Sequence, residues 1–293
     1  LTQQHFRWYV NTNAATPTDV WPSGGTDVAT DAAIQISDDA PSVNDVLSLR
    51  LSILDSNVAL SSGALSLKLQ YAADTSCTAD STWRDVAPIG STTAIWRGYN
   101  NAGVTDGSTL PSVLLTTADV AATYEEENDS TTNPNSISTT QEGEWDWVLQ
   151  HNATEGTNYC FRAITSEGET LNAYSVYPSL VTNAKPGAPT LSKLFDNEKV
   201  ASTTPWFEFS AEDPESNDMT YQVQIDDTYD FSSAVVDRDS QTNFTEFSNV
   251  TTPADKDPFT TGQTIRFIPT TALSNSTTYY WRVSAGNASG YST

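Results

Sequence analysis

Thr157-Asn158-Tyr159-Cys160-Phe161-Arg162-Ala163 recurs 120 positions later as Thr277-Thr278-Tyr279-Tyr280-Trp281-Arg282-Val283, and both stretches follow the pattern Thr-x-Tyr-x-aromatic-Arg-small. Each copy comes after a segment with alternating large apolar residues, residues 145–148 before the first and residues 265–268 before the second. The offset is the same for these segments. A constant offset indicates an internal repeat. The alternative is a chance match between two amphipathic strands.

A Tyr that opens a strand after a polar corner, with aromatic and small residues alternating behind it, is typical of the tyrosine corner of immunoglobulin-like and fibronectin type III-like sandwiches. We therefore predict an all-β chain of two tandem β-sandwiches of this class. Residues 1–184 are expected to form the first, with long inserted loops and a disulfide, and residues 185–293 the second. A chain of 293 residues is long enough for two hydrophobic cores.

The composition is strongly acidic, with 13 Lys and Arg against 37 Asp and Glu and a formal net charge of -24. This charge argues against nucleic acid as a partner, because contacts to phosphates require a basic surface. It also disfavours anionic membrane surfaces, and no apolar run approaches the roughly 20 residues of a membrane-spanning helix. The charge itself has two interpretations, solubility or a surface that binds divalent cations.

The two cysteines, Cys77 and Cys160, both lie in the first half of the chain. We predict a structural disulfide between them, since no other Cys or His lies close enough in sequence to complete a metal site. The bridge is expected to staple the outer face of one sheet, and it implies an oxidising, extracellular compartment. Candidate N-glycosylation sequons, which favour the same compartment, begin at Asn128, Asn152, Asn243, Asn249, Asn275 and Asn287.

Alternation of apolar and polar residues predicts the strands of the first domain. Residues 5–10 place Phe6, Trp8 and Val10 on one face. Residues 47–53 and 65–71 are expected to pair with each other across a turn, with polar residues such as Arg50 facing outward. Residues 125–143, which begin with Glu125-Glu126-Glu127, are too polar for a core and are expected to form a long loop.

In the second domain we expect strands at residues 205–211, 220–225, 265–268 and 278–284, after a linker at residues 183–189. A strand equivalent to the last one of the first domain is not found before the sequence stops. An open sandwich exposes unpaired backbone groups, so we expect either a longer natural chain or a strand donated by a neighbouring subunit. The strand of Phe6, Trp8 and Val10 is the candidate donor, and pairing within its own domain is the alternative.

Several first-half motifs point to a family. They are Thr2-Gln3-Gln4-His5-Phe6-Arg7-Trp8-Tyr9, Leu47-Ser48-Leu49-Arg50-Leu51, Leu67-Lys68-Leu69-Gln70-Tyr71, Ala94-Ile95-Trp96-Arg97-Gly98-Tyr99, Thr123-Tyr124-Glu125-Glu126-Glu127-Asn128 and Asn158-Tyr159-Cys160-Phe161-Arg162. In this order they resemble an uncharacterised secreted domain of large surface proteins in bacteria of the candidate phyla radiation. The second half resembles the bacterial fibronectin type III-like modules that follow it. The resemblance implies a surface-exposed structural or adhesive role and brings no catalytic residues.

The sharpest candidate metal site is the acidic stretch with Asp213, Glu215 and Asp218, which together with Asp226-Asp227 resembles the calcium-binding loops of cadherin-like repeats. Hard oxygen ligands of this kind hold Ca²⁺, and a solvated turn is the alternative. No other cofactor is expected.

No catalytic constellation is visible, since His5 and His151 are the only histidines and the common nucleophile and phosphate motifs are missing. We therefore predict that the protein is not an enzyme. Of the eight Trp residues, four lie in alternating strands and are expected in the core: Trp8, Trp147, Trp206 and Trp281.

These features favour a non-enzymatic cell-surface structural protein, a repeating subunit of a filament, pilus-like fibre or surface layer that assembles as a homo-polymer. The alternative is an adhesin or carbohydrate-binding module of a longer secreted protein, which uses exposed Trp rings to bind host or matrix glycans.

Overall fold

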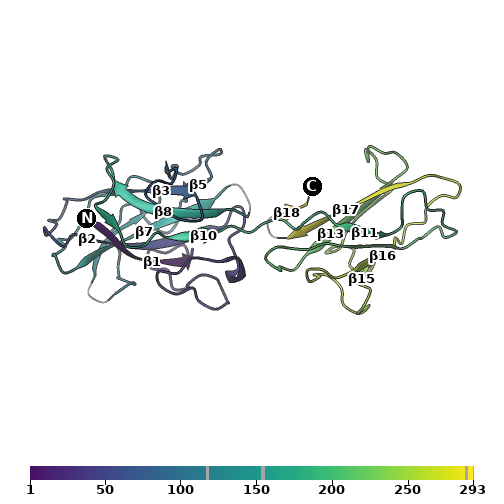
Figure 1. Cartoon of the computed structure of the whole chain (residues 1–293), viewed down its shortest axis with the longest axis horizontal. Coiled ribbons are helices and arrows are strands. Elements are labelled where there is room, and N and C mark those ends of the chain that lie inside the picture. Colours follow the sequence, from purple (N-terminus) through teal and green to yellow (C-terminus); the bar gives the residue numbers. More distant parts are fainter. Residues whose placement is uncertain (117–118, 153–155, 288–289, 293) are drawn as a thin grey trace. The chain divides into compact units, whose positions relative to one another are not determined.

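β-Strands form both parts of the chain, which the computed structural model describes for residues 1–116, 119–152, 156–287 and 290–292 (Figure 1). Contacts divide the chain into unit 1, Leu1–Asn183, and unit 2, Ala184–Thr293. Each unit contains two sheets. Within the described residues the one helical element is the 3-10 turn η1 (Ile36–Asp38), so the predicted all-β class of two immunoglobulin- or fibronectin type III-like sandwiches is confirmed.

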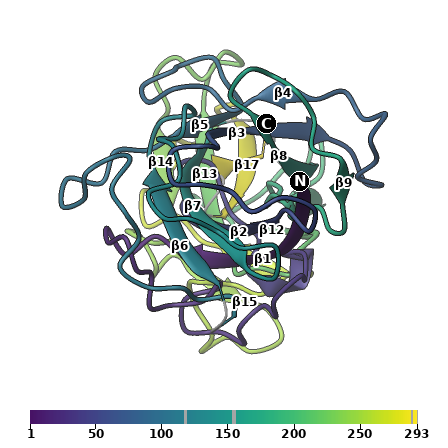
Figure 2. The ribbon, with the colours of Figure 1, turned by 90° about the vertical axis from the view of Figure 1, so that its left-hand side faces the viewer.

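Unit 1 has a large sheet with the order β5-β7-β2-β1-β9, in which β6 also pairs with β7. Its strands are β1 (Thr2–Val10), β2 (Val46–Leu54), β5 (Trp96–Gly98), β6 (Val120–Glu125), β7 (Glu142–His151) and β9 (Ala173–Tyr174). The opposite sheet has the order β10-β8-β3-β4. Its strands are β3 (Leu67–Ala73), β4 (Arg84–Asp85), β8 (Asn158–Thr165) and β10 (Ser179–Val181). Figure 2 shows unit 1 end on, with β1, β2 and β7 in one layer and β3 and β8 in the other.

The expected hairpin of residues 47–53 and 65–71 is wrong. β2 pairs with β1 and β7, whereas β3 pairs with β8 and β4 in the opposite sheet. The two strands face each other across the core, since Leu47, Leu49, Leu67 and Leu69 are all 0% exposed. Alternation identified each strand and its buried face, but it carries no information about the partner strand.

The outer face of β2 is also covered, contrary to expectation. Ser48, Arg50 and Ser52 are buried, because the loops that carry Ala15 and Ser112 lie over this face of the sheet, where Leu110, Tyr124 and Val148 form a second small apolar cluster. The acidic run begins within this sheet. Glu125 ends β6 and is buried, so residues 125–143 are not simply a solvated loop.

β1 lies inside unit 1. It pairs with β2 along its length, and Phe6 and Trp8 are 2% and 0% exposed in the core, while Val10 is half-buried against it. The candidate donor strand β1 is therefore paired within the sheet of its own unit.

Unit 2 has one sheet in the order β11-β12-β16-β15 and another in the order β14-β13-β17-β18. Its strands are β11 (Thr190–Lys193), β12 (Phe207–Ser210), β13 (Thr220–Asp226), β14 (Val236–Asp239), β15 (Phe247–Asn249), β16 (Ile265–Phe267), β17 (Tyr280–Asn287) and β18 (Gly290–Tyr291). In chain order this is the A-B-E-D and C′-C-F-G arrangement of immunoglobulin-like sandwiches. The expectation that the last strand is absent is corrected: β18 begins it, over two residues.

The Arg of the repeated motif has the same structural role in both units, and the tyrosine-corner contact is seen in unit 2. In unit 2 the Tyr279 hydroxyl accepts a hydrogen bond from the Ser274 backbone N–H at 3.0 Å, which is the tyrosine-corner contact. The motif's Arg starts a ladder in which Arg donates to Gln and Gln donates to Asp. The ladder residues are Arg162, Gln70 and Asp85 in unit 1 and Arg282, Gln224 and Asp237 in unit 2. Each guanidinium also lies 4.3 Å from an aromatic ring centroid, that of Trp83 or Phe231.

The predicted disulfide between Cys77 and Cys160 is confirmed, with a Cα–Cα distance of 5.5 Å. It joins β8 to the loop that follows β3, so it closes a chain segment with a sequence separation of 83. Cys160 itself is 0% exposed.

Candidate functional site

A buried ionic cluster under the loops of unit 1 is the most unusual chemical feature of the molecule. Arg50 on β2 lies between two carboxylates of the neighbouring strand β7, with Nη2 3.0 Å from Asp146 Oδ2 and Nη1 3.7 Å from Glu144 Oε2. All three side chains are 0% exposed. Arg50 pairs directly with Asp146 across the two strands, so the register of the sheet places the charges together.

The cluster fastens the covering loops to the sheet. Glu144 accepts hydrogen bonds from the backbone N–H groups of Leu114 and Leu115, both at 2.8 Å. Arg50 donates to the carbonyl oxygens of Ser112 and Ala15 at 3.3 and 3.4 Å. The charged groups thus satisfy backbone groups of loops that have no strand partner there, a structural task rather than a catalytic one.

One cation faces two carboxylates in this cluster, so burial favours a retained proton. Desolvation raises the pKa of Asp146 to about 6, against the lowering effect of Arg50. Desolvation also raises the pKa of Glu144, and a hydrogen bond with Asp119 adds to the effect. On β6, desolvation raises the pKa of Glu125 to about 8, and no hydrogen-bond partner for its Oε2 is found among the described residues.

These shifts predict that unit 1 is more stable in mild acid. The folded state keeps protons on these carboxyl groups at pH values where the unfolded chain has already released them. Their contribution to the free energy of unfolding is therefore fully present near pH 4 and is lost as pH rises through about 6 to 8. We expect the free energy of unfolding to fall on the order of 2 kcal/mol between pH 5.5 and pH 8.5, measured by urea unfolding. Glu125→Gln is expected to flatten this dependence. A wild type that is more stable at pH 8.5 would contradict the assignment.

The side chain of Asn128 acts as an internal strand bridge. Its Oδ1 accepts a hydrogen bond from Leu69 N–H at 2.6 Å, and its Nδ2 donates to the carbonyl oxygens of Leu69 and Val86 at 2.9 and 2.8 Å. Glycosylation replaces one of these N–H hydrogens, so a glycan at Asn128 is incompatible with the folded unit.

The other sequons differ in accessibility. Asn249 is 1% exposed, and Nδ2 of Asn287 donates to Ala184 O and Asp213 Oδ2, both at 2.7 Å. Nδ2 of Asn152 donates to Ala94 O at 3.1 Å. The remaining sequon positions after Asn152 and Asn287 lie outside the described residues. Asn243 is half-buried, and Asn275 is exposed, so Asn275 is the most accessible acceptor among the described ones.

The predicted calcium ligands are only partly brought together. Asp213 is 4% exposed, and its Oδ1 accepts hydrogen bonds from Glu215 and Asn217 N–H at 3.0 and 3.1 Å. Glu215 lies beside it and accepts Ala184 N–H, while Asp218 is exposed. Asp226-Asp227 lies at the other end of β13, a strand of seven residues that spans about 20 Å. Within the described residues no group of three or more His, Cys, Asp or Glu is arranged to hold a metal; calcium stays a prediction.

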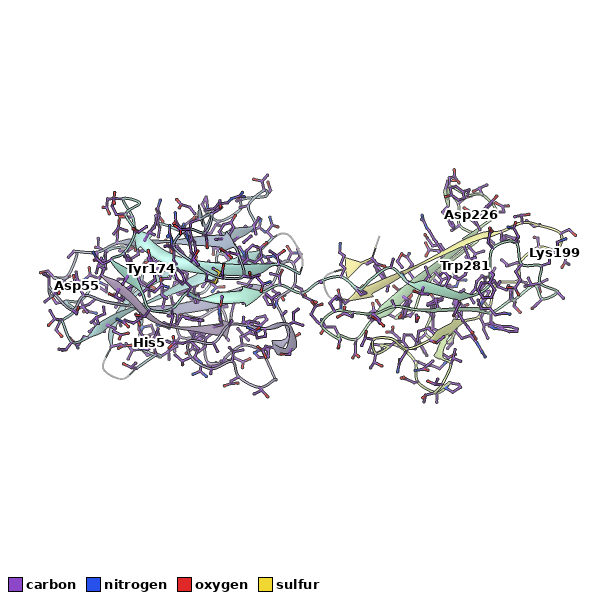
Figure 3. The ribbon with its side chains drawn as sticks, in the orientation of Figure 1. His5, Asp55, Tyr174, Lys199, Asp226 and Trp281 are labelled. Atoms are coloured by element: carbon purple, nitrogen blue, oxygen red, sulfur yellow. A yellow bond between two sulfur atoms is a disulfide. The ribbon has the colours of Figure 1, made fainter. Side chains whose placement is uncertain are left out.

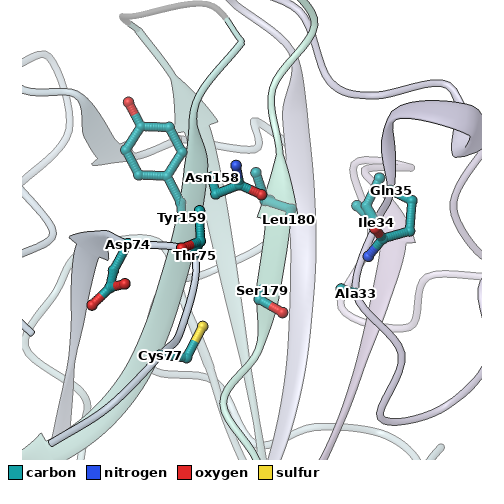
Figure 4. Close-up of a pocket in the computed structure, with 10 residues that line it drawn as sticks. All are labelled: Ala33, Ile34, Gln35, Asp74, Thr75, Cys77, Asn158, Tyr159, Ser179 and Leu180. Carbon is teal, nitrogen blue, oxygen red and sulfur yellow. The ribbon is translucent and has the colours of Figure 1, made fainter. Parts of the chain in front are cut away.

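A cavity of about 150 Å³ beside the disulfide is lined mainly by polar groups (Figure 4). Asp74 is the acid at this cavity, and hydrogen bonds from Ser81 and Ser76 lower its pKa to about 2. A carboxylate with its oxygens occupied in this way is a loop anchor and a poor general base.

The two histidines are held by structural contacts. His5 Nδ1 lies 2.6 Å from Asp31 Oδ2 at the surface (Figure 3), and the ring of His151 packs 4.9 Å from that of Trp96 in the interior.

The expectation that four Trp residues lie in the core is only partly confirmed. Trp8 and Trp147 are buried as expected, but Trp206 is 45% exposed, because the neighbouring Phe207 takes the inward position of the alternation. Trp281 is half-buried on β17 (Figure 3). Trp206 borders a cavity of about 290 Å³ at one end of unit 2.

One edge of β17 in unit 2 is open over part of its length. Ala285 on β17 exchanges hydrogen bonds with Ser292, since Ser292 N–H reaches Ala285 O at 2.6 Å and Ala285 N–H reaches Ser292 Oγ at 3.0 Å. Backbone groups alternate in direction along a strand, so those of Val283 and Trp281 point to the same side. β18 pairs only with Gly286 and Asn287, and in the described part of the chain no strand covers residues 280–284 on this side.

No protein-family model and no curated protein matches the sequence. One similar solved structure is the crystal structure of chicken CNTN1 FN1–FN3 domains, with 13% sequence identity and a TM-score of 0.29. The similarity covers 89% of this chain and 64% of that chain, so this chain spans less than two thirds of that structure's length. In the described residues no helix is long and apolar enough to cross a membrane.

Proposed function

We propose that the chain is a non-enzymatic, extracellular structural protein that repeats as a subunit of a cell-surface filament, pilus-like fibre or surface layer. The sandwich fold and the disulfide fit an extracellular structural or adhesion-type protein. The buried charges fasten loops, and the histidines are engaged in structural contacts. The observation that carries the proposal is the edge of β17 at residues 280–284, which no strand covers within the described residues. Such an edge pairs readily with a further strand, which is either a continuation of the chain or a strand of another subunit, and the proposal takes the second.

Unit 1 shows what the equivalent edge looks like when it is covered. There β10 pairs with β8, and Pro178 O accepts a hydrogen bond from Phe161 N–H at 2.7 Å. Phe161 is 0% exposed. Its counterpart in the repeat, Trp281, is half-buried, and so is Val283. A strand added along β17, from a continuation of the chain or from another subunit, would therefore supply hydrogen-bond partners and cover apolar surface at the same time.

Val283→Pro is the variant that tests this contact, because it deletes one N–H on the open edge without removing a hydrogen bond to β13. We expect its critical concentration for assembly to rise about tenfold or more, measured by sedimentation and light scattering. Val283→Ala, which keeps the N–H, is the matched control and is expected to assemble nearly like the wild type. Thermal unfolding shows whether both variants remain folded.

Two outcomes would count against the proposal. Equal assembly of folded Val283→Pro and Val283→Ala would show that subunits join elsewhere. A wild type that stays monomeric at all concentrations would remove the structural-polymer function itself and favour the adhesin alternative.

A further inference from the structure

The cavity beside Trp206 combines an exposed indole with fixed polar groups. Its volume of about 290 Å³ lies just below the range of small-molecule sites, roughly 300–1,000 Å³. The apolar lining residues are Leu194, Val200, Pro205 and Trp206. The polar lining residues are Lys193, Glu198 and Ser202.

The polar groups of the cavity are pre-positioned by contacts within unit 2. Glu198 accepts a hydrogen bond from Phe195 N–H at 3.0 Å, and its other oxygen lies 3.5 Å from Lys193 Nζ. Lys193 Nζ is in turn 5.2 Å from the centroid of the Trp206 ring. The cavity thus offers an ammonium donor and a carboxylate acceptor next to an aromatic surface.

A second ion pair flanks the same ring. Arg266 Cζ lies 5.8 Å from the Trp206 centroid, and Arg266 Nη2 is 2.6 Å from Glu208 Oε1. The cations around Trp206 are therefore each neutralised by a Glu. The site has donors and acceptors but no excess charge.

We propose that this cavity binds a neutral pyranose, as one ring of an oligosaccharide or polysaccharide. Lys193 Nζ and Arg266 Cζ lie over the Trp206 ring, and the side chain is 45% exposed, so the C–H face of a pyranose would pack against the part of the indole that the two cations leave open. The vicinal hydroxyls of a pyranose both donate and accept, which matches the Lys193–Glu198 pair. An anionic ligand fits less well, because it would compete with Glu198 and Glu208 in a chain with a net charge of -24. An acyl chain would desolvate the Lys193–Glu198 ion pair without offering it a hydrogen-bond partner.

The test is a titration of the full chain with neutral gluco-, manno- and galacto-configured hexasaccharides, followed by Trp fluorescence and calorimetry. We expect saturable binding of at least one of them, weakened about tenfold or more by Trp206→Ala and less by Trp206→Phe. Trp83→Ala in unit 1 is the matched control, since Trp83 is a half-buried Trp beside a cation in the other unit, and it is expected to leave binding unchanged.

Three results would overturn the proposal: no binding of any neutral hexasaccharide at about 10 mM, equal binding by Trp206→Ala, or binding confined to uronic-acid glycans and abolished by salt. The inference does not rest on the polymer function, because Trp206 directly precedes β12, which belongs to a different sheet from β17. Trp206→Ala is accordingly expected to assemble like the wild type.

Discussion

Arg50→Met is expected to destabilise unit 1 by about 3–5 kcal/mol, the cost of leaving buried charges without their partner. Arg50 is the only basic group within ion-pair distance of Glu144 and Asp146 among the described residues, and all three side chains are fully buried. Its loss also removes the donors to Ser112 O and Ala15 O, so the covering loops lose part of their anchor. Urea unfolding, with the transition of unit 2 as an internal reference, measures the effect.

The matched control removes the charges together. The triple variant Arg50→Met, Glu144→Gln, Asp146→Asn carries no buried charge in the cluster, so it is expected to recover a large part of the lost stability. The defect of Arg50→Met alone should also shrink toward pH 5, where the two carboxyls take up protons. A loss below about 1 kcal/mol at pH 8 would contradict the cluster as the anchor of the loops.

Replacing both cysteines, Cys77→Ala with Cys160→Ala, is expected to cost unit 1 about 4–5 kcal/mol. The bridge closes a segment with a sequence separation of 83, and the chain-entropy estimate for such a loop is of this size. For a unit of this length the melting temperature should fall by about 8–20 °C. Differential scanning calorimetry resolves this loss from the transition of unit 2, which contains no cysteine.

A chemical control accompanies the double variant. Reduction of the wild type should reproduce the lower transition, and the same treatment should leave the double variant unchanged. A wild type that melts at the same temperature with and without reductant would show that the bridge is not a main source of stability.

Much of the fold was predictable because its signals are local. Alternation marks β2, β3 and β13 and names their buried faces, and the repeated Tyr and Arg mark the corner strands. Pairing was not predictable in the same way. β2 and β3 are neighbours in sequence yet lie in opposite sheets, since each buries the same kind of apolar face whichever partner it takes.

The candidate sites were harder to predict, because their chemistry depends on tertiary cover. Arg50 alternates with leucines along β2, a pattern that predicts an exposed side chain. It is buried because loops lie over that face of the sheet. The Arg–Gln–Asp ladder was not predictable from the repeat either, since Gln70 and Gln224 are 154 residues apart whereas Arg162 and Arg282 are 120 apart. Trp206 has the pattern of a strand residue, and its exposure follows from which of two adjacent aromatic residues turns inward.

Electron microscopy of the native material in non-denaturing buffer, with the intact mass of the denatured chain beside it, tests the proposed assembly most directly. We expect regular fibres or ordered arrays, which Val283→Pro reduces and Val283→Ala does not. Monodisperse single particles at every concentration, from a chain that calorimetry shows to be folded, would contradict it.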